Sequence, residues 1–288
     1  MDIKIDKKEI YIEPITSCNL KCKLCYANVI NGKDSKIIDK VVILDFVNRF
    51  LDFKKDNIEI YWCGSGEVFL HKEFPSIINE LSSERIEHTI MTNGTIDILD
   101  EFNTLSNINL RVSIDGPKEH HEWNRGLGTY EKSIDFCKKA LRLNCKSLEI
   151  RALVTKDNIM LLEEFEKDLF SRIGKKIDLQ IIPPYSSKDI NKINTLSIKK
   201  SISEEADKKV IPMDKIEDML RSKYGEKYGN LEHRSDIVLS TCVMCHGVFS
   251  CCEGIFRIGN FNSGIEELEK NLTNSDIKCR SCSLFGKC

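Results

Sequence analysis

Strand-like and helix-like segments alternate along residues 9–182, and this alternation limits the possible fold more than any other feature of the chain. Short runs rich in β-branched and aromatic residues predict strands at 9–15, 58–62, 87–92, 108–114, 147–154 and 177–182. The intervening segments predict helices at 36–54, 73–84, 97–104, 129–143 and 157–170. Strands that are joined by helices run parallel, with the helices packed outside the sheet. The pattern therefore predicts an α/β fold, a partial (β/α)6 TIM-like barrel.

Residues with distinctive chemistry follow the predicted strands. In barrels of this kind the functional residues lie at the carboxyl ends of the strands. A cysteine-rich loop follows the first strand, and the later strands are followed by residues 63–67, 92–95, 115–117, 155–158 and 183–185. These loops are rich in Gly, Asn, Asp and Pro, which are also ordinary turn residues. Their position after every predicted strand favours a functional site at this end of the barrel.

Cys18, Cys22 and Cys25 lie in the first of these loops, with the spacing C-x3-C-x2-C. Three thiolates on one short loop can bind three irons of a [4Fe-4S] cluster. The fourth iron then has no protein ligand, and an open coordination position distinguishes catalytic metal centres from structural ones. The alternative is a structural zinc site with its fourth ligand elsewhere, although zinc sites more often combine two C-x2-C pairs.

The composition excludes several other classes of protein. The chain has 288 residues, 13 cysteines, 31% charged residues and a formal net charge of −2. This balance predicts no nucleic-acid partner and no binding to an acidic membrane surface. The first residues lack the apolar segment of a signal peptide, and no run of about 18 apolar residues would span a membrane. We therefore expect a cytoplasmic protein whose clustered cysteines bind metal.

The composition also predicts a division into three parts. Residues 1–183 form the predicted barrel, and residues 184–235 are rich in charged and small polar residues. This middle part is expected to be a linker or lid with one helix at 213–223. Residues 236–288 carry seven of the cysteines among short strand-like runs and turns. This last part is expected to be a small, metal-organised module.

The loop TSCNLKCKLCYA resembles the signature of radical S-adenosylmethionine (radical SAM) enzymes. The segments YWCGSGEVFLHKEF, MTNGT, SIDGP with the following HHEWNRG, and LVTKDN resemble further motifs of that family in the same order. The resemblance implies a [4Fe-4S] cluster on Cys18, Cys22 and Cys25, with S-adenosylmethionine (SAM) bound to the open iron. It also implies reductive cleavage of SAM to a 5′-deoxyadenosyl radical, which removes a hydrogen atom from the substrate. An external one-electron reductant such as flavodoxin or ferredoxin is then expected.

The same resemblance implies residues that contact SAM. Ser65, Gly66 and Glu67 are expected to face the methionine amino group, although Ser65 stands where the family usually has glycine and Val68 where it often has proline. Ser113 and Asp115 stand where family members contact the ribose or the carboxylate; a pair that only caps a turn is the alternative. The backbone of Leu24 and the side chain of Leu153 stand where the adenine is usually held.

The C-terminal cysteines resemble the auxiliary-cluster extension called SPASM, or its shorter form called twitch. The resemblance implies at least one auxiliary [4Fe-4S] cluster, and one is favoured over two because the chain stops at Cys288. The candidate ligands are Cys242, Cys245, Cys252, Cys279, Cys282 and Cys288. A zinc ribbon formed by Cys242 and Cys245 with Cys279 and Cys282 is the alternative.

Three functions stay open after this reading. Radical SAM proteins with this extension mostly modify peptides, so a peptide substrate is the first hypothesis, with cross-linking, epimerisation or oxidation of a residue as the reaction. A dehydrogenase of a small alcohol is the second, and a zinc-organised binding protein is the third. His71, His120 and His121 are expected to be solvated loop residues, and Cys63, Cys137 and Cys145 to be packing residues.

Overall fold

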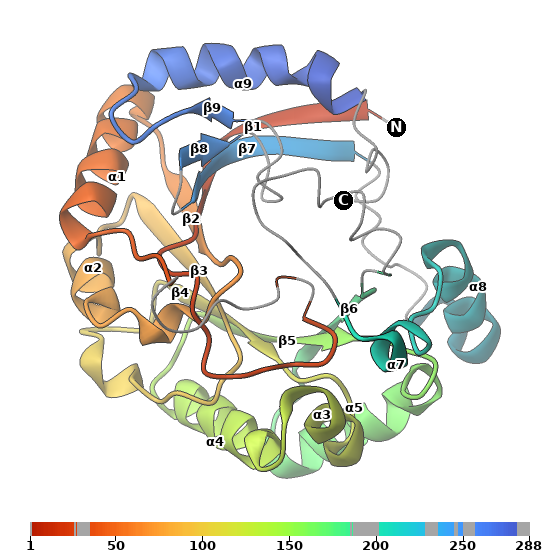
Figure 1. The fold of residues 1–288 in the computed structure, drawn as a ribbon. Helices are drawn as coiled ribbons and strands as arrows, with labels where there is room; N and C mark the ends of the chain where they lie inside the picture. Colours follow the sequence, from red (N-terminus) through yellow and green to blue (C-terminus); the bar gives the residue numbers. More distant parts are fainter. Residues whose placement is uncertain are drawn as a thin grey trace.

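The computed structural model describes residues 2–25, 27, 35–184, 186, 202–227, 236–244, 247–249 and 257–280. Its centre is one curved sheet with the strand order β6-β5-β4-β3-β2-β1-β7-β8-β9 (Figure 1). The first six strands along the chain are β1 Asp2–Ile12, β2 Ile58–Trp62, β3 Ile86–Thr92, β4 Ile108–Ser113, β5 Ser147–Leu153 and β6 Asp178–Ile182. Each is parallel to its neighbours among these six. The predicted α/β fold with six parallel strands is confirmed.

Helices surround the outer side of this curved sheet (Figure 1). They include α1 Lys40–Lys54, α2 Phe74–Glu80, α3 Lys118–Arg125, α4 Thr129–Arg142 and α5 Leu162–Ile173. Short 3-10 turns lie at Val68–Leu70, Leu99–Glu101, Ile159–Leu161 and Gly225–Lys227. The helix expected at 97–104 is therefore only a single turn, and the segment after β4 contains α3, a helix that the sequence analysis treated as loop.

Side chains along β4 and β5 alternate between an apolar outer face and a polar inner face. β4 and β5 alternate buried and partly exposed residues along most of their length, as a period of two requires. Leu110 and Ile150 belong to the buried set and share one core with Phe46 of α1. Arg111 and Glu149 stand opposite each other in the register, and their Nε and Oε1 atoms are 3.3 Å apart. The inner face of the sheet thus carries charged groups.

The cysteine-rich C-terminal part continues the same sheet. β7 Asp236–Met244 is parallel to β1, while β8 Gly247–Phe249 and β9 Arg257–Gly259 add antiparallel strands. α9 Ile265–Arg280 contacts β1 and β7, and its own residues Leu268 and Leu272 are buried. A partly buried ion pair between Lys54 and Glu269 joins α9 to α1. The sequence analysis predicted neither α9 nor the addition of β7 to the barrel sheet, and the division into parts at 183 and 235 stays a prediction.

The middle part contains α7 Glu204–Asp207 and α8 Met213–Tyr224. The second of these confirms the helix predicted at 213–223. In the ranges that the structure describes, no helix combines the length and the apolar composition needed to cross a membrane.

Candidate active site

The three N-terminal cysteines lie on the loop that follows β1. Cys18, Cys22 and Cys25 are free thiols, and each is partly exposed. A turn closes the C-x2-C part of the loop, because the amide of Cys25 donates to the carbonyl of Cys22 at 3.1 Å. The Cys18 sulfur accepts from the amide of Leu20 at 3.4 Å and from Asn93 Nδ2 at 3.8 Å.

The chemistry of these thiols fits the iron–sulfur cluster that the sequence predicts. Burial raises the pKa of Cys18 and raises that of Cys22 to about 12; the Cys25 thiolate raises both pKa values, and that of Cys18 raises the pKa of Cys22. All three thiols stand on one short loop, and a bound metal would deprotonate them outright. Within the described ranges no three His, Cys, Asp or Glu side chains form a ready-made metal site. The three donors thus share one loop, but their arrangement in the described structure is not that of a ligated metal.

Glu67 connects the loop after β2 to the end of β3. Its carboxylate is buried and accepts from Thr92 Oγ1 at 2.7 Å, from the amide of Asn93 at 2.7 Å and from the amide of Phe69 at 3.3 Å. Burial raises the pKa of Glu67, although these hydrogen bonds oppose the shift. Asn93 in turn donates to Asn19 Oδ1 at 2.9 Å. This chain of contacts fixes the Cys18 side of the cysteine loop to the rim of the barrel.

Gly66 lies directly against the first residues of the cysteine loop. A Cβ atom on Gly66 would lie 2.4 Å from the Ile15 carbonyl oxygen and 2.5 Å from that of Ser17. The next residue completes the contact, because the amide of Glu67 donates to the Ser17 carbonyl at 2.8 Å. The close approach that requires glycine here is thus to the backbone of the chain itself.

Ser65, which replaces the usual glycine, is held by Glu13. Its amide and its hydroxyl donate to Glu13 Oε1 at 2.7 Å and 2.6 Å. The serine hydroxyl thus has a partner inside the protein. Whether Ser65, Gly66 and Glu67 contact SAM stays a prediction.

Asp115 is at the centre of a second buried network, which begins at the end of β4. Its side chain is fully buried and accepts from Asn124 Nδ2 at 2.7 Å, from Arg125 Nε at 2.7 Å, from Arg125 Nη2 at 2.9 Å and from the amide of Leu153 at 3.2 Å. These four donors occupy all the acceptor positions of a carboxylate. Burial alone would raise the pKa of Asp115, but the charge and hydrogen bonds of Arg125 outweigh it and lower that pKa.

The predicted contact of Ser113 and Asp115 with the ribose or carboxylate of SAM stays a prediction. Ser113 lies at the end of β4 and is partly exposed. In the structure the Asp115 carboxylate binds groups of the chain itself, so a ligand would have to displace one of them.

The histidines are not solvated, contrary to the sequence analysis. His71, His120 and His121 are all buried. His121 lies in α3, where its Nδ1 accepts from the amide of Asp115 at 3.3 Å. Burial lowers the pKa of His121 to about 4, so its ring is neutral near pH 7. For His120 and His121 the expectation was wrong because the segment after β4 forms a helix whose buried face is polar, and for His71 because its Nε2 is buried against the Ile38 carbonyl at 2.9 Å.

Leu24 and Leu153 lie in one apolar cluster with Trp123, Ile202, Ala206 and Val210. The structure thus brings together the two residues predicted near the adenine, and covers them with residues 202–210. Lys23 and Lys209 place their ammonium groups 4.7 Å and 4.0 Å from the centroid of the Trp123 ring. The contact of Leu24 and Leu153 with adenine stays a prediction.

The C-terminal cysteines are described only in part. Cys242 lies in β7, opposite Tyr11 of β1, and Cys279 lies in α9. Cys245, Cys252, Cys282 and Cys288 lie outside the described residues. The auxiliary ligand set therefore stays a prediction. Cys137 is fully buried in the main core, as expected for a packing residue.

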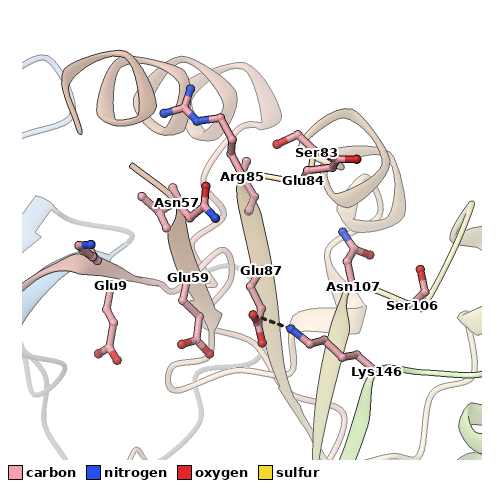
Figure 2. A pocket seen from close by; sticks show the side chains of 13 residues that line it. Glu9, Asn57, Glu59, Ser83, Glu84, Arg85, Glu87, Ser106, Asn107 and Lys146 are labelled. Carbon is pink, nitrogen blue, oxygen red and sulfur yellow. Dashed lines mark ion pairs between the residues drawn. The ribbon is translucent and has the colours of Figure 1, made fainter. Parts of the chain in front are cut away.

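A cavity of about 420 Å³ lies at the opposite end of the sheet (Figure 2). It is lined by residues at the amino ends of β2, β3 and β4 and by Glu9 and Lys146. Figure 2 shows the carboxylates of Glu9, Glu59 and Glu87 on the same side, with Glu87 paired to Lys146 at 2.6 Å. Because active sites of parallel barrels lie at the carboxyl ends of the strands, we do not place the reaction in this cavity.

The comparison with known families agrees with a site at the carboxyl ends of the strands. The model of the radical SAM superfamily matches residues 12–172, which is over half of the chain. The chain belongs to the radical SAM superfamily. Membership implies a [4Fe-4S] cluster and SAM as cofactors, and it makes this radical SAM protein an enzyme. It also agrees with the positions of Cys18, Cys22 and Cys25 at the carboxyl end of β1.

Two curated proteins are similar to this radical SAM enzyme. The uncharacterised protein MJ0907 of Methanocaldococcus jannaschii is 27% identical over 190 residues, which are 62% of this chain and 63% of that protein. The tungsten-containing aldehyde ferredoxin oxidoreductase cofactor-modifying protein of Pyrococcus furiosus is 29% identical over 91 residues, which are 31% of this chain and 24% of that protein. The chain thus matches less than two thirds of the length of either relative.

Solved structures share the fold over nearly the whole chain. Native anSMEcpe with bound AdoMet superposes with a TM-score of 0.71 at 20% identity, covering 97% of this chain and 87% of that one. SuiB of Streptococcus suis bound to S-adenosylmethionine gives a TM-score of 0.62 at 17% identity, covering 98% and 72%. At these identities the likeness shows the fold alone.

Several residues of the site were missed by sequence reasoning. Asn19, Asn93 and Asn124 connect the cysteine loop to the strand ends, and Arg125 binds Asp115 just after β4. All four stand inside segments that carry the family resemblance, TSCNLKCKLCYA, MTNGT and HHEWNRG, and that was the available signal. Their partners lie far away along the chain, so no local pattern could identify the contacts.

Proposed function

We propose that this radical SAM enzyme modifies a peptide. Two further structures of similar fold contain peptides: anSMEcpe with bound AdoMet and Cp18Cys peptide, and SuiB bound to the precursor peptide SuiA. Their TM-scores are 0.70 and 0.58, and their identities to this chain are 18% and 17%. The comparison supports an architecture that can bind a peptide. The evidence from this chain itself is the polar inner face of its sheet.

The polar inner face of the sheet is the observation that carries the proposal. A complete barrel of this type is filled by layers of apolar side chains. Here the inward positions of β4 and β5 include Asn109, Arg111, Glu149 and Arg151, all partly exposed. Such a surface stays hydrated and offers many hydrogen-bond donors and acceptors, which suits the backbone amides of a peptide better than it suits an apolar substrate.

Different residues of the chain are proposed to bind the cluster and SAM. Cys18, Cys22 and Cys25 would hold the cluster. With SAM bound, the cluster supplies one-electron cleavage of the sulfonium and a carbon-centred oxidant for the substrate. Ser65, Gly66, Glu67, Ser113 and Asp115 are proposed on the methionine and ribose side, with Leu24 and Leu153 on the adenine side. The buried networks around Glu67 and Asp115 keep the loop in place while the substrate exchanges.

The C-terminal part is proposed to hold at least one auxiliary [4Fe-4S] cluster. Its ligands would come from Cys242, Cys245, Cys252, Cys279, Cys282 and Cys288. An external one-electron reductant such as flavodoxin or ferredoxin would complete the system. Cys242 lies in β7 and Cys279 in α9, two elements that contact each other.

The test is anaerobic turnover with SAM and dithionite, followed by chromatography for 5′-deoxyadenosine. Peptides encoded beside the gene are added one at a time, and mass spectrometry follows each peptide. We expect one of them to raise deoxyadenosine formation and to change in mass. Stimulation by small polyols and by none of the peptides would instead support the alcohol dehydrogenase.

Alanine variants of the cysteines give the control. Replacing Cys18, Cys22 or Cys25 should abolish deoxyadenosine formation, whereas Cys145→Ala removes another partly exposed free thiol and should leave it intact. Iron and sulfide are measured on the same samples. Zinc without iron in the anaerobically purified protein would contradict the proposal and favour the zinc-organised binding protein.

A further inference from the structure

The end of α3 contacts the two residues that lie between Cys22 and Cys25. The amide of Lys23 donates to the carbonyl of Asn124 at 2.9 Å, and the amide of Leu24 donates to Asn124 Oδ1 at 2.9 Å. One asparagine therefore satisfies both backbone donors inside the C-x2-C turn. Because a backbone amide without a partner is costly when buried, these contacts hold the turn in one conformation.

The Asn124 side chain is itself fixed. It is only 1% exposed, and its Nδ2 donates to Asp115 Oδ2 at 2.7 Å. The carboxylate can only accept and the Leu24 amide can only donate, so the two partners determine which way the amide group points. The turn is thus connected to the end of β4 through a rigid, buried path.

Arg125 places a positive charge beside the same turn. Its guanidinium binds Asp115 through two nitrogens, and its side chain is 11% exposed. Arg125 directly follows Asn124, and its partner Asp115 accepts from the same Asn124 side chain that binds the Leu24 amide, so both charges lie beside the Cys22–Cys25 turn. Solvent and salt screen buried charges only weakly, so both charges act on whatever the thiols bind.

We propose that Asn124 and Arg125 are positioning residues of the cluster site, Asn124 by fixing the backbone of the Cys22–Cys25 turn and Arg125 by stabilising the reduced cluster. The inference rests on the cluster binding that belongs to the proposed function. Reduction adds one electron, and thus one negative charge, at the cysteines. A fixed cation nearby stabilises that added charge, so it raises the reduction potential, and a fixed anion lowers it.

The charge part of the proposal predicts shifts of opposite sign. Arg125→Gln should make the potential of the N-terminal cluster more negative, and Asp115→Asn should make it less negative. Removing a nearby charge should change the equilibrium constant for reduction by at least about tenfold. For a one-electron couple, a tenfold change equals a shift of about 59 mV in the reduction potential. Arg125→Lys keeps the charge, so the equilibrium constant for reduction of its cluster should stay within about threefold of the wild-type value.

The measurement is a redox titration followed by electron paramagnetic resonance, on anaerobically purified protein. Only the signal that changes when SAM is added is used, because it identifies the N-terminal cluster. Shifts in the same direction for Arg125→Gln and Asp115→Asn, or no shift in either, would overturn the role of charge. If Arg125→Gln does not fold, the sign of the shift in Asp115→Asn decides.

The backbone part of the proposal has a matched control. Asn79 also bridges a loop, donating to the Glu101 carbonyl at 3.0 Å and accepting from the amide of Asn103 at 2.8 Å, but it does not contact the cysteine loop. Asn124→Ala should lose iron to a chelator at least about tenfold faster than the wild type, as residues that support metal ligands generally do. Asn79→Ala should lose it at the wild-type rate.

Equal rates in the two asparagine variants would refute the role of Asn124. That outcome is distinct from failure of the proposed function, in which the wild-type protein itself would bind no iron and show no response to SAM.

Discussion

Gly66→Ala tests whether the contact between the β2 loop and the cysteine loop holds the site together. The added Cβ would lie 2.4 Å from the Ile15 oxygen, 2.5 Å from the Ser17 oxygen and 2.9 Å from the Thr16 carbonyl carbon, and all three are backbone atoms that no rotamer change can move. The two segments would have to separate, which breaks the 2.8 Å hydrogen bond between the Glu67 amide and the Ser17 carbonyl.

Two effects add in this variant. Inserting one carbon into a tightly packed place costs about 1–3 kcal/mol, and the lost hydrogen bond costs about 1 kcal/mol more. We therefore expect the free energy of unfolding to fall by about 2–4 kcal/mol. Since the displaced segment leads directly into Cys18, the iron content should fall as well.

Urea unfolding under anaerobic conditions measures the loss, and Gly264→Ala is the control. A Cβ on Gly264 would meet no atom within 4 Å, so that variant should unfold like the wild type. If Gly66→Ala and Gly264→Ala have equal midpoints, the close approach is not what requires glycine at position 66, and the reasoning fails.

Two further predictions concern the core and the segment that covers Leu24. Burial lowers the pKa of His88 from 6.5 to about 4, so the stability that comes from its neutral ring is complete above pH 6.5 and is lost as the pH falls toward 4. When the pH is lowered from 7.5 to 5, the free energy of unfolding measured in urea should therefore fall by about 2 kcal/mol less in His88→Gln than in the wild type. Equal losses in the two proteins would contradict this. Lys209→Gln removes an ammonium group 4.0 Å from the Trp123 ring centroid and an ion pair with Asp157, so limited proteolysis within residues 202–210 should be about three- to tenfold faster. Lys208→Gln, for which no side-chain contact is described, is its control; equal cleavage of the two would show that the Lys209 contacts do not hold this segment.

Much of the barrel could be predicted because its signals are local. The apolar residues of 36–54 and 129–143 recur at helical spacing, and strands such as 108–114 alternate along their length, so α1, α4 and β4 were found within a few residues of their observed ends. The cysteine spacing likewise identified the site without knowledge of the fold.

α3 was missed because its buried face is polar. The segment KEHHEWNR buries His120, His121 and Asn124, and an apolar period is therefore absent. α9 was missed for a different reason. Ile265, Leu268 and Leu272 have helical spacing and are buried, but residues of low helix propensity, such as Asn and Ser, follow them closely, and the sequence analysis described all of residues 236–288 as short strands and turns.

Glu67 and Asp115 show why residue roles are harder to predict than residue positions. Both were placed at the SAM site by resemblance, and both lie at the carboxyl end of the barrel, where they were expected. In the structure each is a buried acid that accepts from an asparagine, Asn93 or Asn124, which in turn contacts the cysteine loop on one side of it. The loop is thus held at two points by two strand ends, β3 and β4. A substitution at either acid would therefore alter the cluster before it altered any direct contact with SAM, so iron content must be measured before a loss of SAM binding is assigned to these carboxylates.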